Sequence, residues 1–267
     1  MNILNVAHGS FYALGAYSSA WLLGKYFLFG LPPSGSYLLI LVAALLVGAF
    51  VGILVERCLL RFMYDRDEVV IVLVTYAVFL IFEDLMKLVW GVESYMPYQP
   101  RYLLGNVSVV GLPFVIYDLC LVALAVVIGA LAWLGLNKTR PGKLLVAVIY
   151  DREISVAMGI NVERIFTITF VIGAILGALG GAFTAPLIAV SPGIGIEIIV
   201  LAFAVVVIGG LGSIEGAAVG ALIVGLGRAT AVHLLPQAEL FIVFAVMTLV
   251  LLIRPHGLFG KADFRKI

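Results

Sequence analysis

The chain has 267 residues, of which 64% are hydrophobic and 12% are charged, and its mean hydropathy is +1.21. This composition excludes a soluble enzyme, because a water-exposed surface needs many more charged residues. The formal net charge of +1 gives no reason to expect a nucleic-acid partner, and the 29 glycines favour closely packed helices in a membrane. We therefore predict an all-α fold, in which residues 1–267 form a single polytopic domain of transmembrane helices.

Apolar segments recur along the chain, and most have the ~20 residues that a helix needs to cross the hydrocarbon core of a bilayer. We predict about eight of them, with Pro- and Gly-rich turns between several neighbours. The segment at 197–208 is short, so it either crosses the membrane or dips in and returns. The predicted segments cover residues 10–29, 37–55, 69–90, 114–136, 165–188, 197–208, 214–235 and 239–253.

Two stretches interrupt apolar sequence with small residues, NVAHGS at 5–10 and IGGLGS at 208–213. Each contains a Gly-Ser pair, after which a new helix can start with the positive end of its dipole pointing into the membrane. Such discontinuous helices suit an anionic or dipolar ligand and indicate a transport path, although chance similarity explains the repeat equally well. The predicted translocation path consists of Asn5, His8, Gly9, Ser10, Gly209, Gly210, Gly212 and Ser213.

Glycines recur at every fourth residue in three segments, and each set falls on one face of a helix. Small residues at this spacing let a neighbouring backbone approach closely. We expect contacts between helices of this chain rather than a dedicated dimer interface. The sets are Gly48 with Gly52, Gly173 with Gly177 and Gly181, and Gly216 with Gly220.

Ionisable residues also occur inside the apolar segments, where they commonly mark a pathway or a paired site. Glu83, Asp84 and Lys87 lie late in one segment, and Arg228 and His233 lie in the outer half of another. All are near segment ends, so we expect snorkelling and a pair between Glu83 and Lys87 at i, i+4 rather than substrate binding. An alternative hypothesis makes Glu83, Asp84 and His233 the relay of a proton-coupled transporter.

Lys and Arg are distributed unevenly between the two sides that eight crossings define. With the N-terminus in the cytoplasm, twelve of the 16 basic residues fall on the cytoplasmic side, as expected for cytoplasmic loops. Glu56 lies at this boundary and is expected to be solvated. The twelve are Arg57, Arg61, Arg66, Lys138, Arg140, Lys143, Arg152, Arg164, Arg254, Lys261, Arg265 and Lys266, and the other four are Lys25, Lys87, Arg101 and Arg228.

Residues 137–164, NKTRPGKLLVAVIYDREISVAMGINVER, form a long charged segment within this apolar chain. We predict a cytoplasmic loop that meets another protein. A short helix in DREISVAM can end at Gly159, because glycine adopts a left-handed conformation without a steric cost.

Four separated motifs resemble the membrane permeases of branched-chain amino acid ABC importers, the LivH type. They are NVAHGSFYALGAY, DREISVAMGINVERIFTITFVIGAILGALGG, VIGGLGSIEGA and IRPHGLFG, and together they extend over nearly the whole chain. Val6 replaces the phenylalanine of the family motif. The family normally carries a further apolar segment before this motif, so we expect either a start upstream or an N-terminally truncated permease.

The resemblance implies that the charged segment couples the permease to an ATPase, through Asp151, Arg152, Glu153, Ala157 and Gly159. It also implies two ATPase subunits, a second permease subunit, an extracytoplasmic solute-binding protein and a small-molecule substrate, in a bacterial or archaeal cytoplasmic membrane whose lipid surrounds the spans. Branched-chain amino acids are the leading substrates, and urea or short amides are the alternative.

The chain carries no phosphate-binding loop of its own. GLFGKA at 257–262 has the wrong glycine spacing and no hydroxyl residue after the lysine. We also expect no metal site, no cofactor and no catalytic residue, so ATP hydrolysis falls to partner subunits. A non-transporting membrane scaffold is the third hypothesis, which the glycine breaks disfavour.

Overall fold

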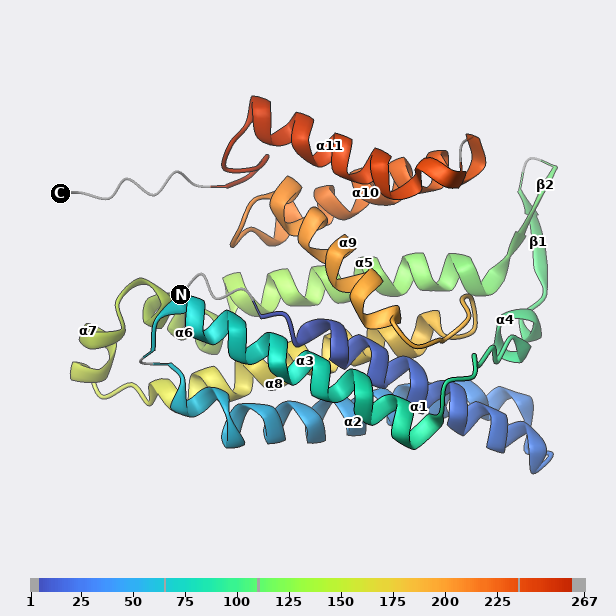
Figure 1. The fold of residues 1–267 in the computed structure, drawn as a ribbon, viewed down its shortest axis with the longest axis horizontal. Coiled ribbons are helices and arrows are strands. Elements are labelled where there is room, and N and C mark those ends of the chain that lie inside the picture. The colour runs from blue at the N-terminus through green and yellow to red at the C-terminus, as the bar shows by residue number, and fades with distance from the viewer. Residues whose placement is uncertain (1–4, 65, 110, 235, 261–267) are drawn as a thin grey trace. The chain divides into compact units, whose positions relative to one another are not determined.

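The computed structural model describes residues 5–64, 66–109, 111–234 and 236–260 (Figure 1). The chain divides into two compact units, which we treat separately. Unit 1 comprises Ile3–Ile128 and Leu136–Ile196, and unit 2 comprises Gly129–Gly135 and Glu197–Ile267. The prediction of a single domain stays a prediction. The predicted basic residues Lys261, Arg265 and Lys266 lie outside the described residues.

Eight long helices coincide with the eight predicted apolar segments. Within the described residues, six helical segments are long and apolar enough to cross a membrane. The prediction of a polytopic helical bundle is therefore confirmed. The eight helices are α1 (His8–Leu28), α2 (Ser36–Cys58), α3 (Glu68–Trp90), α5 (Ile116–Lys138), α8 (Val162–Thr184), α9 (Ile194–Gly209), α10 (Ile214–Leu234) and α11 (Glu239–Ile253).

The connections contain shorter elements. Residues 137–164 are not a plain loop, because they include α6 (Arg140–Tyr150) and α7 (Arg152–Ala157). Between α3 and α5 lie α4 (Gln99–Leu103) and an antiparallel hairpin of β1 (Asn106–Val109) and β2 (Leu112–Val115). The all-α prediction misses this hairpin. Its strands have only four residues each, which is too short a stretch for the alternation of apolar and polar residues to identify a strand reliably.

Helix α1 forms the centre of unit 1, where it packs against α2, α3 and α8. More than half of its residues are buried, including Phe11, Tyr17 and Leu23. Although α1 is long enough to cross a membrane, it is not among the six apolar segments. Its serines and glycines suit a helix that is surrounded by protein instead of lipid.

The four-residue glycine spacing in α8 faces α1, as predicted. A Cβ at Gly181 would overlap the backbone carbonyl of Tyr12, and one at Gly177 would lie 3.3 Å from the Cβ of Phe11. A Cβ at Gly173 would lie 3.0 Å from Nε2 of His8. These glycines thus set the distance between α1 and α8.

Glycines on α2 have the same function. A Cβ at Gly48 would lie 2.6 Å from the Cα of Ile175, and one at Gly52 would lie 2.8 Å from the Cβ of Ala174. The expectation of helix contacts within the chain is therefore confirmed for α2 as well as for α8.

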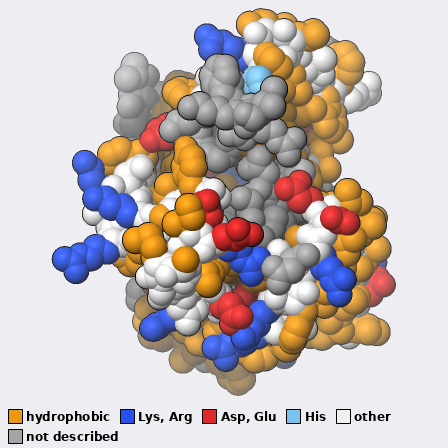
Figure 2. Space-filling model, turned by 90° about the vertical axis from the view of Figure 1, so that its left-hand side faces the viewer, with side chains coloured by type: hydrophobic (Ala, Val, Ile, Leu, Met, Phe, Trp, Pro, Cys, Tyr) orange, Lys and Arg blue, Asp and Glu red, His pale blue; other side chains and the backbone are white. Residues whose placement is uncertain are grey.

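Basic residues gather at the end of unit 1 where α2 ends, α6 and α7 lie and α8 begins. We call this the basic end; Figure 2 faces it and shows Lys and Arg side chains mixed with Asp and Glu. A small core of Val148, Val162 and Phe166 joins α6 to α8 there, with Tyr64 packed against it. The residues of the basic end are Arg57, Arg61, Arg66, Lys138, Arg140, Lys143, Arg152 and Arg164.

In unit 2, α9 and α10 are antiparallel neighbours. A Cβ at Gly209 would overlap the Gly216 backbone, and one at Gly220 would overlap the carbonyl of Val205. The third glycine set is therefore also a helix contact. Ala204 and Ile208 of α9, Val224 of α10 and Val243 of α11 form one buried cluster.

Arg228 ties the other ends of these three helices together. Its guanidinium forms an ion pair of 2.6 Å with Glu197 near the start of α9 and a second with Glu239 at the start of α11. Helix α9 runs from this ion pair to Gly209 without a reversal. Residues 197–208 thus lie within one continuous helix of 16 residues, and whether this helix crosses the membrane or re-enters stays a prediction.

Candidate functional site

The N-terminal part of the predicted translocation path lies at the start of α1. Asn5 precedes the helix, and its Oδ1 accepts a hydrogen bond of 3.0 Å from the backbone N–H of Ala7. His8 begins the helix, and its imidazole packs edge-on against Phe11 and Phe170, with centroid distances of 5.4 and 6.0 Å. The sequence predicts a start after Gly9-Ser10, whereas the first turn already contains both residues.

Gly9 and Ser10 are buried in this turn. The carbonyl of Gly9 faces Gly195, at which a Cβ would lie 3.2 Å from the oxygen. The Oγ of Ser10 is buried and has no hydrogen-bond partner among the described residues. Because an unpaired buried hydroxyl is costly, Ser10 is the position in this turn that a polar ligand group would satisfy.

Glu83 lies on the inner face of α3 and not on the surface. Its side chain is 6% exposed, and its Oε1 accepts a hydrogen bond of 2.5 Å from the backbone N–H of Gly193. Its Oε2 is buried without a partner among the described residues. Gly193 has a φ of +91° and directly precedes α9. Glu83 therefore anchors the connection between α8 and α9.

The expected pair of Glu83 with Lys87 is wrong. Lys87 Nζ lies 3.1 Å from Asp84 Oδ1, and the side chain of Asp84 is 76% exposed. Consecutive helical residues point about 100° apart, so Glu83 faces the bundle while Asp84 faces outward. These two carboxylates do not form one relay, and His233 is exposed in unit 2.

A second interaction holds the same connection. The backbone N–H of Tyr95 donates to the carbonyl of Val190 at 2.9 Å, and the N–H of Val190 donates to the carbonyl of Tyr95 at 2.8 Å. The connection from α8 to α9 is thus fixed at two points, of which only Glu83 uses a side chain.

We expect Glu83→Leu to loosen this connection, because the N–H of Gly193 loses its acceptor. Leaving a buried donor without a partner costs about 1–3 kcal/mol, which corresponds to roughly five- to hundredfold faster amide exchange at residues 190–195. Hydrogen–deuterium exchange of the purified chain measures this. Asp84→Leu is the matched control and should leave the exchange rate unchanged; equal rates in both variants would contradict the assigned anchor.

The unit 2 part of the predicted path is a tight turn. After α9 ends at Gly209, Gly210 and Gly212 adopt φ angles of +102° and +83°, which only glycine adopts readily. Ser213 then caps α10, since its Oγ accepts a hydrogen bond of 2.9 Å from the N–H of Gly216. The apolar helix does not resume in its old direction here, because this turn reverses the chain.

Residues that the sequence analysis did not assign to the path cover this turn. The N–H of Leu258 donates to the carbonyl of Ile208 and the N–H of Phe259 donates to that of Gly209, both at 2.9 Å. These bonds satisfy carbonyls that the end of α9 leaves without an intrahelical donor. The motif IRPHGLFG thus packs on the motif VIGGLGS. Its Pro and Gly were the signal for a turn, but no sequence feature indicated its partner.

The two parts of the predicted path lie in different units, so their assembly into one path stays a prediction. Unit 1 contributes Asn5, His8, Gly9 and Ser10, and unit 2 contributes Gly209, Gly210, Gly212 and Ser213.

The predicted coupling residues surround α7. Asp151 caps this helix, since its Oδ1 accepts a hydrogen bond of 2.9 Å from the N–H of Ile154. Gly159 has a φ of +79°, so the predicted left-handed helix end is confirmed. Asp151, Glu153, Ala157 and Gly159 are exposed, and Arg152 is half-buried. The role of these residues in coupling stays a prediction.

Apolar side chains around α7 were not among the predicted site residues. Tyr150 and Met158 are 83% and 76% exposed, and Ile154 and Val156 are exposed as well. Exposed apolar side chains bordered by charges are typical of a protein interface. The sequence feature that could have identified them is their position within a charged segment, because a fully solvated loop contains few large apolar residues.

Glu56 is fully buried, so the expectation of a solvated carboxylate is wrong. Its Oε1 accepts hydrogen bonds from Thr167 Oγ1 at 2.8 Å and from the Tyr64 hydroxyl at 3.5 Å. Burial raises the pKa of the Tyr64 hydroxyl, and the neighbouring Glu56 carboxylate raises it further. Glu56 joins α2 to the first turns of α8, because α8 packs over this end of α2.

Comparison with known proteins identifies the family. A family model described as "Branched-chain amino acid transport system / permease component" matches residues 1–252. The permease protein LivH of the high-affinity branched-chain amino acid transport system of Escherichia coli (strain K12) is 27% identical over 282 residues, which cover 100% of this chain and 89% of that protein. The BraD permease protein of Pseudomonas aeruginosa is 25% identical over 275 residues, with coverage of 100% and 89%.

An archaeal relative also matches. The probable branched-chain amino acid transport permease protein LivH of Methanocaldococcus jannaschii is 28% identical over 284 residues, which cover 100% of this chain and 85% of that protein. No solved structure matches the chain. The apolar helices and these relatives make the chain a multi-pass protein of the cytoplasmic membrane. The resemblance seen in the motifs is confirmed: the chain belongs to the family of branched-chain amino acid transport system permease components.

Proposed function

We propose that this chain is the membrane permease subunit of an ATP-binding cassette importer for branched-chain amino acids. The family match over residues 1–252 is the observation that carries this proposal. Two ATPase subunits, a second permease subunit and an extracytoplasmic solute-binding protein complete the proposed importer. The substrate is leucine, isoleucine or valine, and urea or short amides are the alternative.

In this proposal, α7 and its surroundings dock on an ATPase subunit. The exposed side chains of Ile154 and Met158 support this role, because apolar anchors at the centre of an interface supply most of its affinity. Asp151 and Glu153 supply charges at the rim, which select the partner and its orientation. Gly159 ends the helix and turns the chain toward α8.

In this proposal the start of α1 and the turn at 209–213 both belong to the translocation path. The unpaired hydroxyl of Ser10 supports the first assignment, because a ligand carboxylate or ammonium group is a suitable partner.

The purified chain alone should hydrolyse no ATP, whereas co-expression with its ATPases should give a complex of two permease and two ATPase subunits. The complete importer in proteoliposomes should take up labelled leucine only with ATP on the ATPase side. ATP hydrolysis by the isolated chain would contradict the proposal.

Two further measurements, the effect of a proton uncoupler and competition by unlabelled solutes, separate the alternatives. Uptake that a proton uncoupler abolishes would favour a proton-coupled transporter. Competition by excess valine but not urea supports branched-chain amino acids as substrates, and the reverse result favours urea or short amides.

A further inference from the structure

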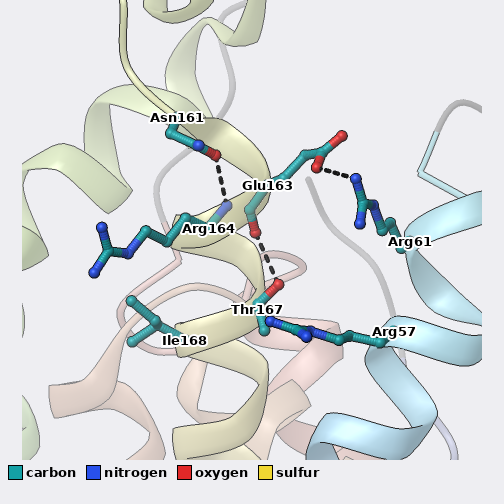
Figure 3. A pocket seen from close by; sticks show the side chains of 7 residues that line it. All are labelled: Arg57, Arg61, Asn161, Glu163, Arg164, Thr167 and Ile168. Carbon is teal, nitrogen blue, oxygen red and sulfur yellow. Dashed lines mark hydrogen bonds and ion pairs between the residues drawn. The ribbon is translucent and has the colours of Figure 1, made fainter.

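A pocket opens at the basic end of unit 1, between the end of α2 and the start of α8 (Figure 3). Its volume is about 370 Å³, which is large enough for a phosphate group with its ester substituents. None of the predicted translocation or coupling residues lines this pocket. The lining residues are Arg57, Arg61, Asn161, Glu163, Arg164, Thr167 and Ile168.

Three arginines line this pocket, and Figure 3 shows Arg57 and Arg61 on one side of the start of α8 and the Arg164 guanidinium on the other; among the described residues only one of the three has an ion-pair partner. Arg61 Nη2 lies 2.5 Å from Glu163 Oε2. The guanidinium groups of Arg57 and Arg164 have no carboxylate within ion-pair distance among the described residues, and both side chains are exposed. Two positive charges thus remain for a ligand.

A further carboxylate, that of Glu56, accepts a hydrogen bond from the pocket residue Thr167. It is fully buried behind that hydroxyl and does not line the pocket. Even with Glu56 and Glu163 both ionised, three cations face two carboxylates, so the local charge stays positive.

The first turn of α8 adds to this positive potential. Asn161 caps the helix, since its Oδ1 accepts a hydrogen bond of 3.0 Å from the backbone N–H of Arg164. The positive end of the α8 dipole therefore points to the pocket. The N–H groups of the Asn161 amide are neutral donors suited to phosphate oxygens, whereas the Thr167 hydroxyl donates to Glu56.

One wall of the pocket is apolar and continues along the bundle. Ile168 lines the pocket and is 48% exposed, and Ile172, one turn further along α8, is 52% exposed. On α2, Phe50 and Leu54 are exposed below Arg57. Cations at the end of two spans, above exposed aliphatic side chains, match the order of headgroup and acyl chain in a lipid leaflet.

We propose that this pocket binds the phosphodiester group of an anionic phospholipid. The guanidinium groups of Arg57 and Arg164 contact the phosphate, and the acyl chains lie along Ile168 and Ile172. A carboxylate from an ATPase subunit would satisfy the cations but would leave the adjoining aliphatic surface uncovered. An anionic phospholipid pairs with the cations and covers the aliphatic surface, and its binding joins the end of α2 to the start of α8. This inference is independent of the transported substrate.

Native mass spectrometry of the detergent-solubilised full chain, titrated with phosphatidylglycerol, tests the proposal. The double variant Arg57→Gln/Arg164→Gln leaves the ion pair of Arg61 with Glu163 intact and should still fold. Each cation near a lipid phosphate changes affinity about fivefold, so we expect about 25-fold weaker binding of phosphatidylglycerol by the double variant. Arg140→Gln/Lys143→Gln removes the same charge from α6, at exposed positions of the same end, and should bind like the wild type.

Four results would overturn the lipid assignment. Equal affinity of the Arg57/Arg164 variant and the wild type would show that the pocket does not hold the lipid, and equal weakening by the α6 variant would show general surface attraction. Displacement of phosphatidylglycerol by an equimolar amount of inorganic phosphate would identify a site for free anions. If the Arg57/Arg164 variant binds phosphatidylglycerol normally but no longer copurifies with the ATPase subunits, the pocket is an ATPase contact. Weakened phosphatidylglycerol binding with unchanged phosphatidylethanolamine binding supports the proposal.

Discussion

Replacing Gly159 with arginine should leave membrane insertion at the wild-type level and reduce ATP-driven uptake at least tenfold. An added Cβ at this position meets no atom within 4 Å, so the side chain itself disturbs no packing in the chain. The φ of +79° costs a residue with a Cβ about 1–2 kcal/mol, which shifts the end of α7 and places a bulky cation on the proposed docking surface. Uptake into vesicles, normalised to the quantity of inserted protein, measures the effect.

Two controls separate docking from backbone strain. Gly30→Arg is a matched variant, since Gly30 has a φ of +64° and open space at its Cβ, but it lies between α1 and the start of α2, whereas the basic end lies where α2 ends. It should retain uptake. Gly159→Asn should also retain most of the uptake, because asparagine tolerates the left-handed conformation. Normal uptake by Gly159→Arg would remove the support for α7 as the coupling helix.

Gly181→Leu should prevent correct packing of α8 on α1 and give the largest loss of folded protein among the glycine variants. The Tyr12 carbonyl occupies the space that the new side chain needs, so the two helices must move apart. Overpacking of this kind costs at least about 1–3 kcal/mol. Thermal stability and the monodisperse fraction in detergent measure the loss.

Gly177→Leu should have a smaller effect of the same sign, because a Cβ at Gly177 lies 3.3 Å from Phe11 Cβ and its neighbour can yield. The matched control is Gly225→Leu, in the middle of α10, where a Cβ meets no atom within 4 Å. Its yield should equal that of the wild type. Equal losses at Gly181 and Gly225 would mean that the larger side chain lowers the yield at any position of a helix, and that the close approach to α1 does not explain the result.

Apolar length and small-residue spacing predicted most of the bundle. They located all eight long helices, and the spacing at Gly173, Gly177 and Gly181 predicted a helix contact that the structure places against α1. These features could be predicted because the hydrophobic thickness of a bilayer and the 3.6-residue period act on each segment separately. The end of α7 at Gly159 was predictable for a similar reason, since its backbone conformation is local.

Features that depend on a distant partner could not be predicted. Glu83 and Glu56 are adjacent to exposed charged residues in the sequence, yet both side chains are buried, because α1 and the α8–α9 connection cover one and α8 covers the other. The packing of Leu258 on the end of α9 joins residues that are far apart in the chain. Only tertiary structure decides which of two neighbouring carboxylates faces inward.

The central position of α1 has a consequence for membrane biogenesis. A segment enters the bilayer from the translocon according to its own free energy of transfer into lipid, and α1 is the long helix of unit 1 that falls outside the six apolar segments. Its partners α2, α3 and α8 all follow it in the sequence. Helix α1 is therefore the long helix of unit 1 that is least able to remain in lipid alone, and we expect its stable insertion to depend on contacts with α2, α3 and α8.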